Sequence, residues 1–147
     1  MNAHVIRPAH SGDYRSIRAL LESEGLPTQD VTVEQIPRFY VASLGDARLL
    51  GCIAFEQFRS DALLRSLAVA DGSRRQGLGH ALVEILERDA AINGVRHLFL
   101  LTTTAADYFT AIGYRRFDRR LVPDQLQSTS QFASLCPASA TCMIKNL

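Results

Sequence analysis

The sequence predicts one mixed α/β domain built on a mostly antiparallel sheet. The chain has 147 residues, which is the size of a single domain with a hydrophobic core of its own. Three apolar, strand-like segments follow one another at 39–44, 48–58 and 62–69, with turn residues between them. Helical and strand-like patterns then alternate along the rest of the chain. We therefore expect the order β-α-α-β-β-β-α-β-α-β-β over residues 1–147.

The first part of the chain is expected to give a strand, two helices and a three-stranded meander. Residues 4–7 alternate apolar and polar side chains until a proline stops the strand. A helix follows, with N-cap chemistry in residues 11–13, apolar residues at helical spacing and Gly25 as its stop. A short helix at 33–36 ends at a proline. The meander consists of strand 39–44, a turn at 45–46, strand 48–58 and strand 62–69.

The second part is expected to alternate helices with strands. From Gly77 to about Asn93 an apolar stripe recurs at helical spacing, with charged residues on the opposite face. Residues 95–101 are apolar and predict a buried strand. A short helix at 105–112 is stopped by a glycine, and a strand begins at 114–117. We expect one helical turn at 123–126 and a final strand at 140–144.

Composition excludes several classes of partner. A formal net charge of +1 gives no basic face for nucleic acid or for an anionic membrane. No apolar run approaches the roughly 20 residues that cross a bilayer, and the N-terminus lacks the apolar run of a secretory signal. Three cysteines at unhelpful spacings argue against a disulfide framework, so we expect a reducing cytoplasm.

The stretch from Arg65 to Leu82 carries the clearest functional signal. It has a strand, a basic turn with glycines, and the first turn of an amphipathic helix. Backbone N–H groups at a helix start, preceded by Arg74 and Arg75, suit a pyrophosphate, and glycines let that backbone approach the phosphates. The alternative is an ordinary loop-to-helix turn with solvated arginines.

The residues Arg74-Arg75-Gln76-Gly77-Leu78-Gly79 resemble the cofactor motif Gln/Arg-x-x-Gly-x-Gly/Ala of the GNAT (Gcn5-related) N-acetyltransferase family. The order of elements around the motif resembles that family over nearly the whole chain. The resemblance implies a GNAT fold, with a mixed sheet, helices on both faces and splayed central strands, in one acetyltransferase domain at 1–147.

The same resemblance implies how acetyl-CoA is bound. Backbone N–H groups of 76–80 and the two arginines would hold the pyrophosphate, and strand 67–69 would pair with the pantetheine arm. A backbone N–H near Val69 would stabilise the oxyanion. The residues expected to bind the cofactor are Leu67, Ala68, Val69, Arg74, Arg75, Gln76, Gly77, Leu78, Gly79, His80 and Phe109.

The C-terminal part narrows the resemblance to two branches of the family. Residues 100–105, Gly113-Tyr114 and 123–140 resemble the N-acetylglutamate synthase type and, more closely, the small acetyltransferases associated with arsenic resistance. Both imply a small amino acid as the acetyl acceptor, and the arsenic-resistance branch adds amino acids similar to phosphinothricin or arsinothricin. We expect direct transfer to the amine in a ternary complex, because no Cys/His pair is evident for a covalent step. Alternative acceptors are a protein N-terminus, a lysine or a polyamine. A further alternative is a catalytically weak acyl-CoA-binding sensor, and homodimers are frequent in the family.

Three residues are candidates for chemistry at the acceptor. Glu56 is the best-placed carboxylate for a general base, or else an exposed strand residue. Tyr108 is a candidate general acid, or else a packing residue, because Phe109 stands where many family members carry tyrosine. Arg65 could bind a substrate carboxylate, because strand alternation gives it the facing of Leu67; the alternative is an ion pair with Glu56 or Asp61.

No metal is expected. No His or Cys pair has metal-site spacing. Cys136 and Cys142 lie six residues apart, and we interpret them as free cysteines rather than as a site for trivalent arsenic.

Overall fold

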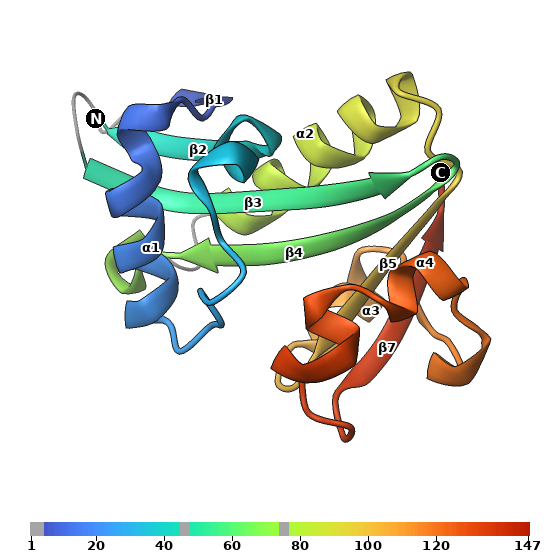
Figure 1. Cartoon of the computed structure of the whole chain (residues 1–147). Coiled ribbons are helices and arrows are strands. Elements are labelled where there is room, and N and C mark those ends of the chain that lie inside the picture. Colours follow the sequence, from blue (N-terminus) through green and yellow to red (C-terminus); the bar gives the residue numbers. More distant parts are fainter. Residues whose placement is uncertain (1–4, 45–47, 74–76) are drawn as a thin grey trace. The chain divides into compact units, whose positions relative to one another are not determined.

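The computed structural model describes residues 5–44, 48–73 and 77–147, and these form a mixed α/β fold (Figure 1). Seven strands are hydrogen-bonded in the order β1-β2-β3-β4-β5-β7-β6. The pairings of β1 with β2, β2 with β3, β5 with β7 and β6 with β7 are antiparallel, and that of β4 with β5 is parallel. The expected mixed, mostly antiparallel sheet is therefore confirmed.

Most elements lie where the sequence places them. The strands are β1 Val5–Pro8, β2 Phe39–Leu44, β3 Arg48–Phe58, β4 Asp61–Val69, β5 His97–Thr102, β6 Arg115–Arg116 and β7 Thr141–Asn146. The α-helices are α1 Tyr14–Ser23, α2 Leu78–Ile92, α3 Ala106–Ala111 and α4 Asp124–Gln127. Single 3₁₀ turns are η1 Ser11–Asp13, η3 Asp71–Ser73 and η4 Arg119–Leu121, and η2 Val33–Arg38 is a longer 3₁₀ segment. The expected turn at 45–46 lies outside the described residues.

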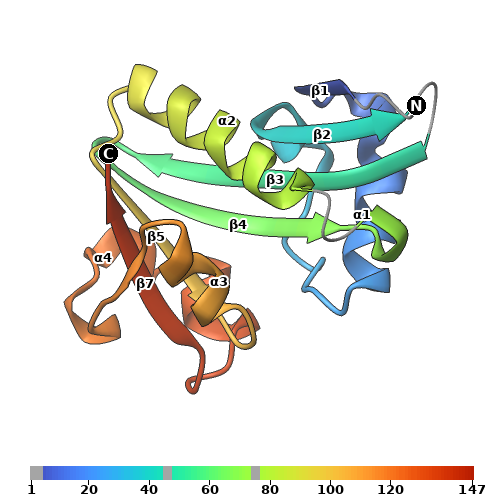
Figure 2. The same cartoon turned by 180° about the vertical axis from the view of Figure 1, so that it is seen from behind.

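The chain divides into two compact units. The first unit comprises residues 1–55 and 66–88, and the second comprises 56–65 and 89–147. In the first unit, α1 covers one face of β2 and β3 and α2 covers the other, as Figures 1 and 2 show from opposite sides. Helices on both faces agree with the expected fold.

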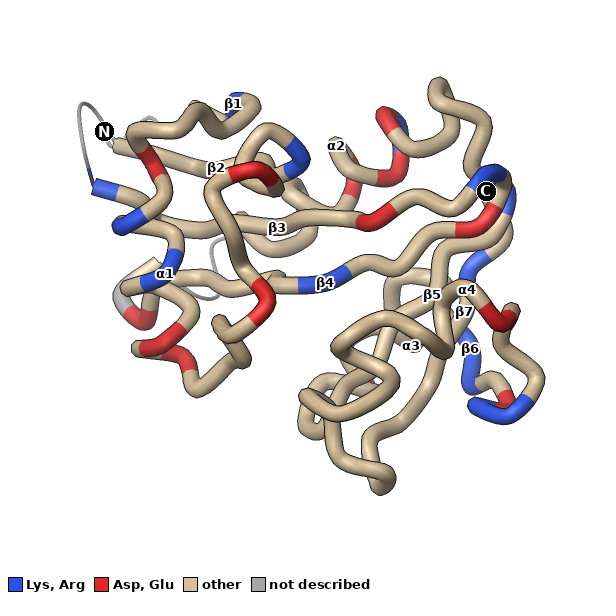
Figure 3. Tube along the Cα trace, in the orientation of Figure 1, with Lys and Arg blue, Asp and Glu red and all other residues tan. Residues whose placement is uncertain are grey.

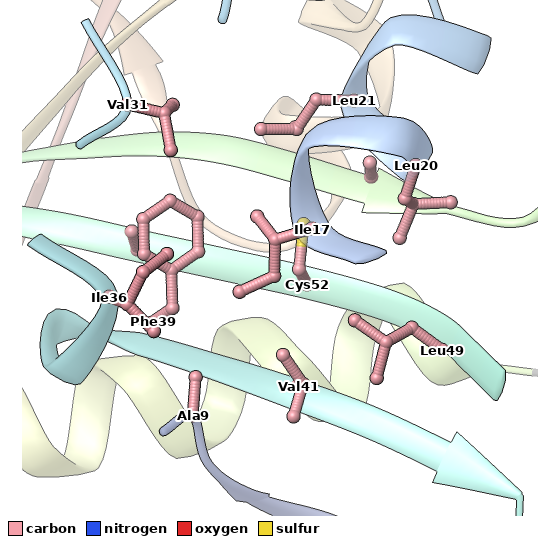
Figure 4. Packing of buried hydrophobic residues seen from close by; sticks show 12 residues of the cluster. Ala9, Ile17, Leu20, Leu21, Val31, Ile36, Phe39, Val41, Leu49 and Cys52 are labelled. Atoms are coloured by element: carbon pink, nitrogen blue, oxygen red, sulfur yellow. The ribbon is translucent and has the colours of Figure 1, made fainter. Parts of the chain in front are cut away.

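The core of the first unit lies between α1 and the strands (Figure 4). Ile17 and Leu21 of α1 are fully buried, as their helical spacing predicts. The buried cluster consists of Ala9, Ile17, Leu20, Leu21, Val31, Ile36, Phe39, Val41, Leu49, Cys52, Ala54 and Ala68.

The entry to α1 differs from the N-cap that the sequence predicts. His10 caps η1, because its Nδ1 accepts a hydrogen bond from the Gly12 N–H at 3.2 Å. Asp13 makes no side-chain cap on α1; its Oδ2 accepts from the His10 N–H at 2.9 Å instead. Asp13 also binds the Arg7 guanidinium through both oxygens. The carboxylate therefore ties β1 to the start of α1.

On the other face, α2 packs closely against β3 at Gly51. A Cβ built at Gly51 would lie 2.9 Å from Leu82 Cδ1 and 3.1 Å from the Ala68 carbonyl oxygen. The absence of a side chain there lets the helix and two strands meet. Leu78, Leu82 and Leu86 of α2 are buried as expected, whereas Ile85 is half-buried.

In the second unit, β7 lies between β5 and β6, with six residues of β5 paired to it from His97↔Asn146 to Thr102↔Thr141. α3 covers one face of β5 and β7, and α4 lies on the other (Figures 1 and 2). The buried cluster beneath α4 consists of Leu63, Phe99, Val122, Leu126, Phe132, Cys142 and Ile144.

The parallel ladder between β4 and β5 is short. It pairs Asp61 with His97, Ala62 with Leu98 and Leu63 with Phe99. All three pairs lie in the second unit.

A stretch without a sequence signal precedes β7. Gln131–Leu135 forms a turn of π-helix. Arg119 holds this segment: its guanidinium donates to the Pro137 and Phe132 carbonyl oxygens at 2.8 and 2.9 Å. Basic residues lie along β6 and the turn after it (Figure 3), and in the sequence Arg119 belongs to this stretch. One member of that stretch, Arg120, pairs with Asp118 at 2.9 Å on the surface.

Candidate functional site

The stretch from β4 into α2 lies in the first unit and has the strand–turn–helix form that the motif predicts. β4 ends at Val69, and the Ala70 N–H bonds the Leu50 carbonyl oxygen at 2.7 Å. η3 follows, with the Ser73 N–H bonded to the Ala70 carbonyl oxygen at 2.8 Å. α2 then begins at Leu78. A 3₁₀ turn therefore follows the strand closely, and a helix begins one residue after the described part of the chain resumes at Gly77.

Gly77 has the backbone conformation that the motif requires. Its φ is +77°, in the left-handed region that favours glycine, and no atom lies within 4 Å of a Cβ built there. Its carbonyl oxygen accepts the Ala81 N–H at 3.0 Å, which closes the first turn of α2. The N–H groups of the first helical turn point out of the helix end, where they can donate hydrogen bonds to an anion.

The remaining motif residues divide into three groups. Arg74, Arg75 and Gln76 lie outside the described residues. Leu78 is buried, so it anchors the helix start in the core rather than contacting a ligand by its side chain. His80 is exposed, with Nδ1 3.9 Å from Glu84 Oε1 one turn later. Only its backbone N–H belongs to the helix end.

The strand expected to bind the pantetheine arm has an irregular backbone. Leu67 and Val69 are half-buried, whereas Ala68 belongs to the buried cluster. Ser66, directly before them, has a φ of +59° inside β4. The facing of Arg65 was inferred from regular alternation, which requires extended backbone at every residue, so that inference does not hold across Ser66.

Glu56 and Arg65 meet in the second unit. Arg65 Nη1 donates to Glu56 Oε1 at 2.7 Å, and the Arg65 side chain is buried. Of the alternatives for Arg65, the ion pair with Glu56 is present, whereas Asp61 pairs with His97 at 2.9 Å. A guanidinium fixes a carboxylate in place through directed hydrogen bonds. The Glu56 carboxylate is therefore held in a fixed orientation by Arg65.

Tyr108 and Phe109 lie side by side on α3 but have different surroundings. Phe109 is buried, packed edge-on to Tyr114 with ring centroids 5.4 Å apart. Tyr108 is exposed at the surface and packs edge-on to Phe109. Partial burial raises the pKa of the Tyr108 phenol above its usual value. Its proton is therefore retained through neutral pH, as a general acid requires.

The three cysteines are all free thiols. Burial raises the pKa of Cys52 to about 12 and that of Cys142 to about 11, so neither is a thiolate at neutral pH. Cys136 donates to Gln131 Oε1 at 3.1 Å. In residues 5–44, 48–73 and 77–147, no three His, Cys, Asp or Glu residues are grouped so as to hold a metal ion.

Two residues near the candidate cofactor strand escaped the sequence analysis. Gly51 and Cys52 of β3 lie against β4, since the Ala68 carbonyl oxygen faces Gly51 and the Cys52 thiol bonds the Ser66 carbonyl oxygen. A glycine inside a strand often marks a close backbone approach, and that signal could have drawn attention to this position. Ser66 gave no signal, because serine is not a residue that favours a positive φ.

Comparison with known proteins identifies the type of domain. The family model of the acetyltransferase (GNAT) domain matches residues 35–116, more than half of the chain. An uncharacterised N-acetyltransferase of Chlorobaculum tepidum is 28% identical over 153 residues, covering 97% of this chain and 96% of that protein.

Solved structures share the fold. N-acetylglutamate synthase of Neisseria gonorrhoeae, complexed with coenzyme A and N-acetyl-glutamate, matches with a TM-score of 0.85 at 24% identity. The match covers 100% of this chain but 36% of the synthase chain, so this chain spans about a third of its length. Rv2747 of Mycobacterium tuberculosis, in complex with CoA, matches with a TM-score of 0.82 at 21% identity over 97% of this chain and 99% of that one. None of the described helices is long and apolar enough to span a bilayer.

Proposed function

The chain belongs to the GNAT acetyltransferase family and is an N-acetyltransferase, and from this we propose that residues 1–147 form one domain that moves an acetyl group from acetyl-CoA to a small amino acid. The observation that carries the proposal is the junction of β4 and α2. There a strand is followed by a left-handed Gly77 and by the open N–H groups of a 15-residue helix.

The proposed cofactor site is built from backbone. The N–H groups at the start of α2, together with Arg74, Arg75 and Gln76, hold the pyrophosphate. The backbone of 67–69 pairs with the pantetheine arm as an added strand would. Solved proteins of the same fold were complexed with CoA, which supports the choice of cofactor.

The proposed acceptor is the α-amine of a small amino acid or analogue. The N. gonorrhoeae synthase was complexed with N-acetyl-glutamate, which supports a glutamate-like acceptor. Within the family, the C-terminal segment most resembles the arsenic-resistance branch, and so we include phosphinothricin and arsinothricin as candidates. Arg65 is proposed to contact the acceptor carboxylate through the same guanidinium that binds Glu56.

The proposed chemistry is direct attack in a ternary complex. Glu56 takes the proton from the amine, and Arg65 keeps the carboxylate oriented for this role. A backbone N–H near Val69 stabilises the oxyanion of the tetrahedral intermediate, and Tyr108 gives a proton to the departing thiolate. A covalent acetyl-cysteine is disfavoured because the Cys52 and Cys142 thiols are buried and the Cys136 thiol donates to Gln131 Oε1.

A second function is favoured by one observation. Phe109 stands where many family members carry the tyrosine that acts as general acid. Its ring is buried and packs edge-on against Tyr114. A chain without a general acid could serve as an acyl-CoA-binding sensor instead of an efficient enzyme. The two functions differ in turnover, not in CoA affinity.

The test is acetyl-CoA-dependent release of CoA, followed with a thiol reagent. The panel contains glutamate, phosphinothricin, arsinothricin, other free amino acids, a polyamine and a peptide. Turnover on one amino acid supports the proposal. Turnover on the polyamine or the peptide alone overturns the choice of acceptor, and tight CoA binding without turnover on any amine favours the sensor.

A further inference from the structure

Ser66 introduces a left-handed residue into the middle of β4. Its φ of +59° lies in a region that L-residues other than glycine seldom occupy, and the strand is extended on both sides. Such a residue turns its own carbonyl and the next N–H away from the directions of a regular ladder. The backbone of Leu67, Ala68 and Val69, which follows directly, takes its direction from this irregularity.

The thiol of Cys52 binds this irregular backbone at Ser66. Cys52 lies on the neighbouring strand β3, where it is completely buried in the cluster beneath α1 (Figure 4). Its S–H donates to the Ser66 carbonyl oxygen, with Sγ 3.3 Å from that oxygen. The thiol of a β3 residue thereby holds a backbone carbonyl of β4 at the irregular position.

The neighbours of Cys52 are apolar and buried. Ile17 and Leu21 of α1 belong to the same buried cluster, and both are completely buried. On the opposite face of β3, the missing side chain of Gly51 allows Leu82 of α2 to approach. Because side chains alternate along a strand, Cys52 and Gly51 set the contacts of β4 with the two layers of the first unit.

We infer that Cys52 is a positioning residue for the acyl-CoA-binding strand: through the Ser66 carbonyl it fixes the backbone groups of 67–69 that meet the pantetheine arm and the acetyl carbonyl. The inference rests on the proposed function, because it assigns Cys52 to the same cofactor site. The thiol itself touches neither cofactor nor acceptor and takes no part in bond making.

The thiol is suited to a permanent role of this kind. Burial in apolar surroundings raises the pKa of Cys52 to about 12, so the proton that it donates to Ser66 is retained at every physiological pH. The same burial keeps oxidants away from the sulfur.

The test compares two substitutions at position 52 with one at a matched cysteine. Cys52→Val keeps an apolar side chain of similar size and the preference for a strand but removes the hydrogen bond to Ser66. Cys52→Ser keeps a donor and an acceptor at the same place. Cys142→Val is the control, because Cys142 is also a buried strand thiol but lies in β7 of the second unit.

For Cys52→Val we expect an acetyl-CoA KM raised about tenfold and a lowered kcat, with the KM for the acceptor unchanged. Cys52→Ser is expected within about threefold of wild type in both constants, and Cys142→Val likewise. Amide hydrogen exchange of Ala68 should accelerate in Cys52→Val and not in Cys142→Val, since the bond from Cys52 to the Ser66 carbonyl holds this part of β4 in place.

The two proposals are tested on different proteins: wild type tests the proposed function, and Cys52→Val tests the role of Cys52. If wild type binds no CoA in calorimetry, the proposed function falls, and the cofactor role of Cys52 falls with it. If wild type binds CoA and turns over while Cys52→Val keeps both its kinetic constants and the protection of the Ala68 amide, the role of Cys52 alone is overturned. A Cys52→Val protein that is merely less stable, with unchanged KM for acetyl-CoA, also overturns it.

Discussion

Arg65 and Glu56 form a nearly buried ion pair: Nη1 lies 2.7 Å from Oε1, with 3% of the arginine side chain and 18% of the glutamate side chain exposed. Removing one member of such a pair leaves the other charge uncompensated in a poorly hydrated place. The pair therefore links the stability of the second unit to the proposed acceptor chemistry.

The substitution Glu56→Gln separates these two contributions. It keeps the shape of the side chain but leaves Arg65 without its anionic partner, and we expect a loss of about 1–3 kcal/mol in the free energy of unfolding by urea. As the proposed base, Glu56 should also contribute about 10²-fold to kcat. Asp61→Asn is the control, since that carboxylate pairs with an exposed histidine, and it should cost less than about 1 kcal/mol. An unchanged kcat in Glu56→Gln would remove the glutamate from the mechanism.

Gly77 and Gly25 offer a matched pair for testing the phosphate site. Their φ values are +77° and +72°, and a Cβ at either meets no atom within 4 Å. Alanine at each position should therefore cost a similar amount of stability, about 1 kcal/mol, from backbone strain alone. Only Gly77→Ala should weaken CoA binding, measured by calorimetry, and Gly77→Val should abolish it. Equal CoA affinities in the Gly25 and Gly77 variants would show that the phosphates bind elsewhere.

Asp13 should make the free energy of unfolding fall with pH in the acid range. The hydrogen-bonded Arg7 guanidinium holds the pKa of Asp13 below its usual value. A depressed pKa stabilises the folded state fully above the ordinary aspartate value of about 3.9, and this stabilisation is lost as the pH falls toward the folded-state pKa.

Accordingly, Asp13→Asn is expected to lower the free energy of unfolding by about 1–3 kcal/mol at pH 7, with the difference from wild type narrowing below about pH 4. Urea unfolding at several pH values measures this difference in the free energy of unfolding. Asp118 serves as the control, because Arg120 also lowers its pKa but both side chains lie at the surface. Asp118→Asn should follow the wild-type curve closely. A pH-independent difference for Asp13→Asn would contradict this account.

Tyr108→Phe tests the proposed general acid. Because burial raises the pKa of this phenol above its usual value of about 10, the wild-type acid is protonated at neutral pH and activity should fall only at strongly alkaline pH. The variant should lose about 10²-fold in kcat and also lose that alkaline limb. Tyr14→Phe on α1 should keep both. An unchanged kcat in Tyr108→Phe would show that the thiolate leaves without a proton from Tyr108.

The structure shows where local sequence signals suffice and where they do not. Strands β2 and β3 match the expected bounds 39–44 and 48–58, because apolar runs between turn residues are determined locally. The π-helical turn at 131–135 was not expected, since its shape depends on hydrogen bonds from Arg119 at a distance in sequence. The 3₁₀ segment at 33–38 extends past Pro37, where the sequence had predicted an end.

The candidate site shows the same division. The motif predicted the helix start and the glycine at its head, both of which follow from neighbouring residues. The pairing of Arg65 with Glu56 remained open in the sequence, because a strand pattern does not specify which cross-strand partner a long side chain reaches. The left-handed Ser66 and its thiol partner on β3 are tertiary features, and no local pattern encodes them.

The order of strands in the second unit has a consequence for synthesis of the chain. β7 is the partner of β5, yet it follows β5 by about 40 residues. At roughly 5–20 residues per second, a ribosome would expose β5 for about 2–8 s before its partner emerges. During that interval β5, with Leu98, Phe99 and Leu100 in its centre, presents a bare apolar edge suited to pairing with another nascent chain. Slower decoding after β5 would lengthen this exposure, and it should raise the fraction of protein that aggregates without altering the stability of the finished fold.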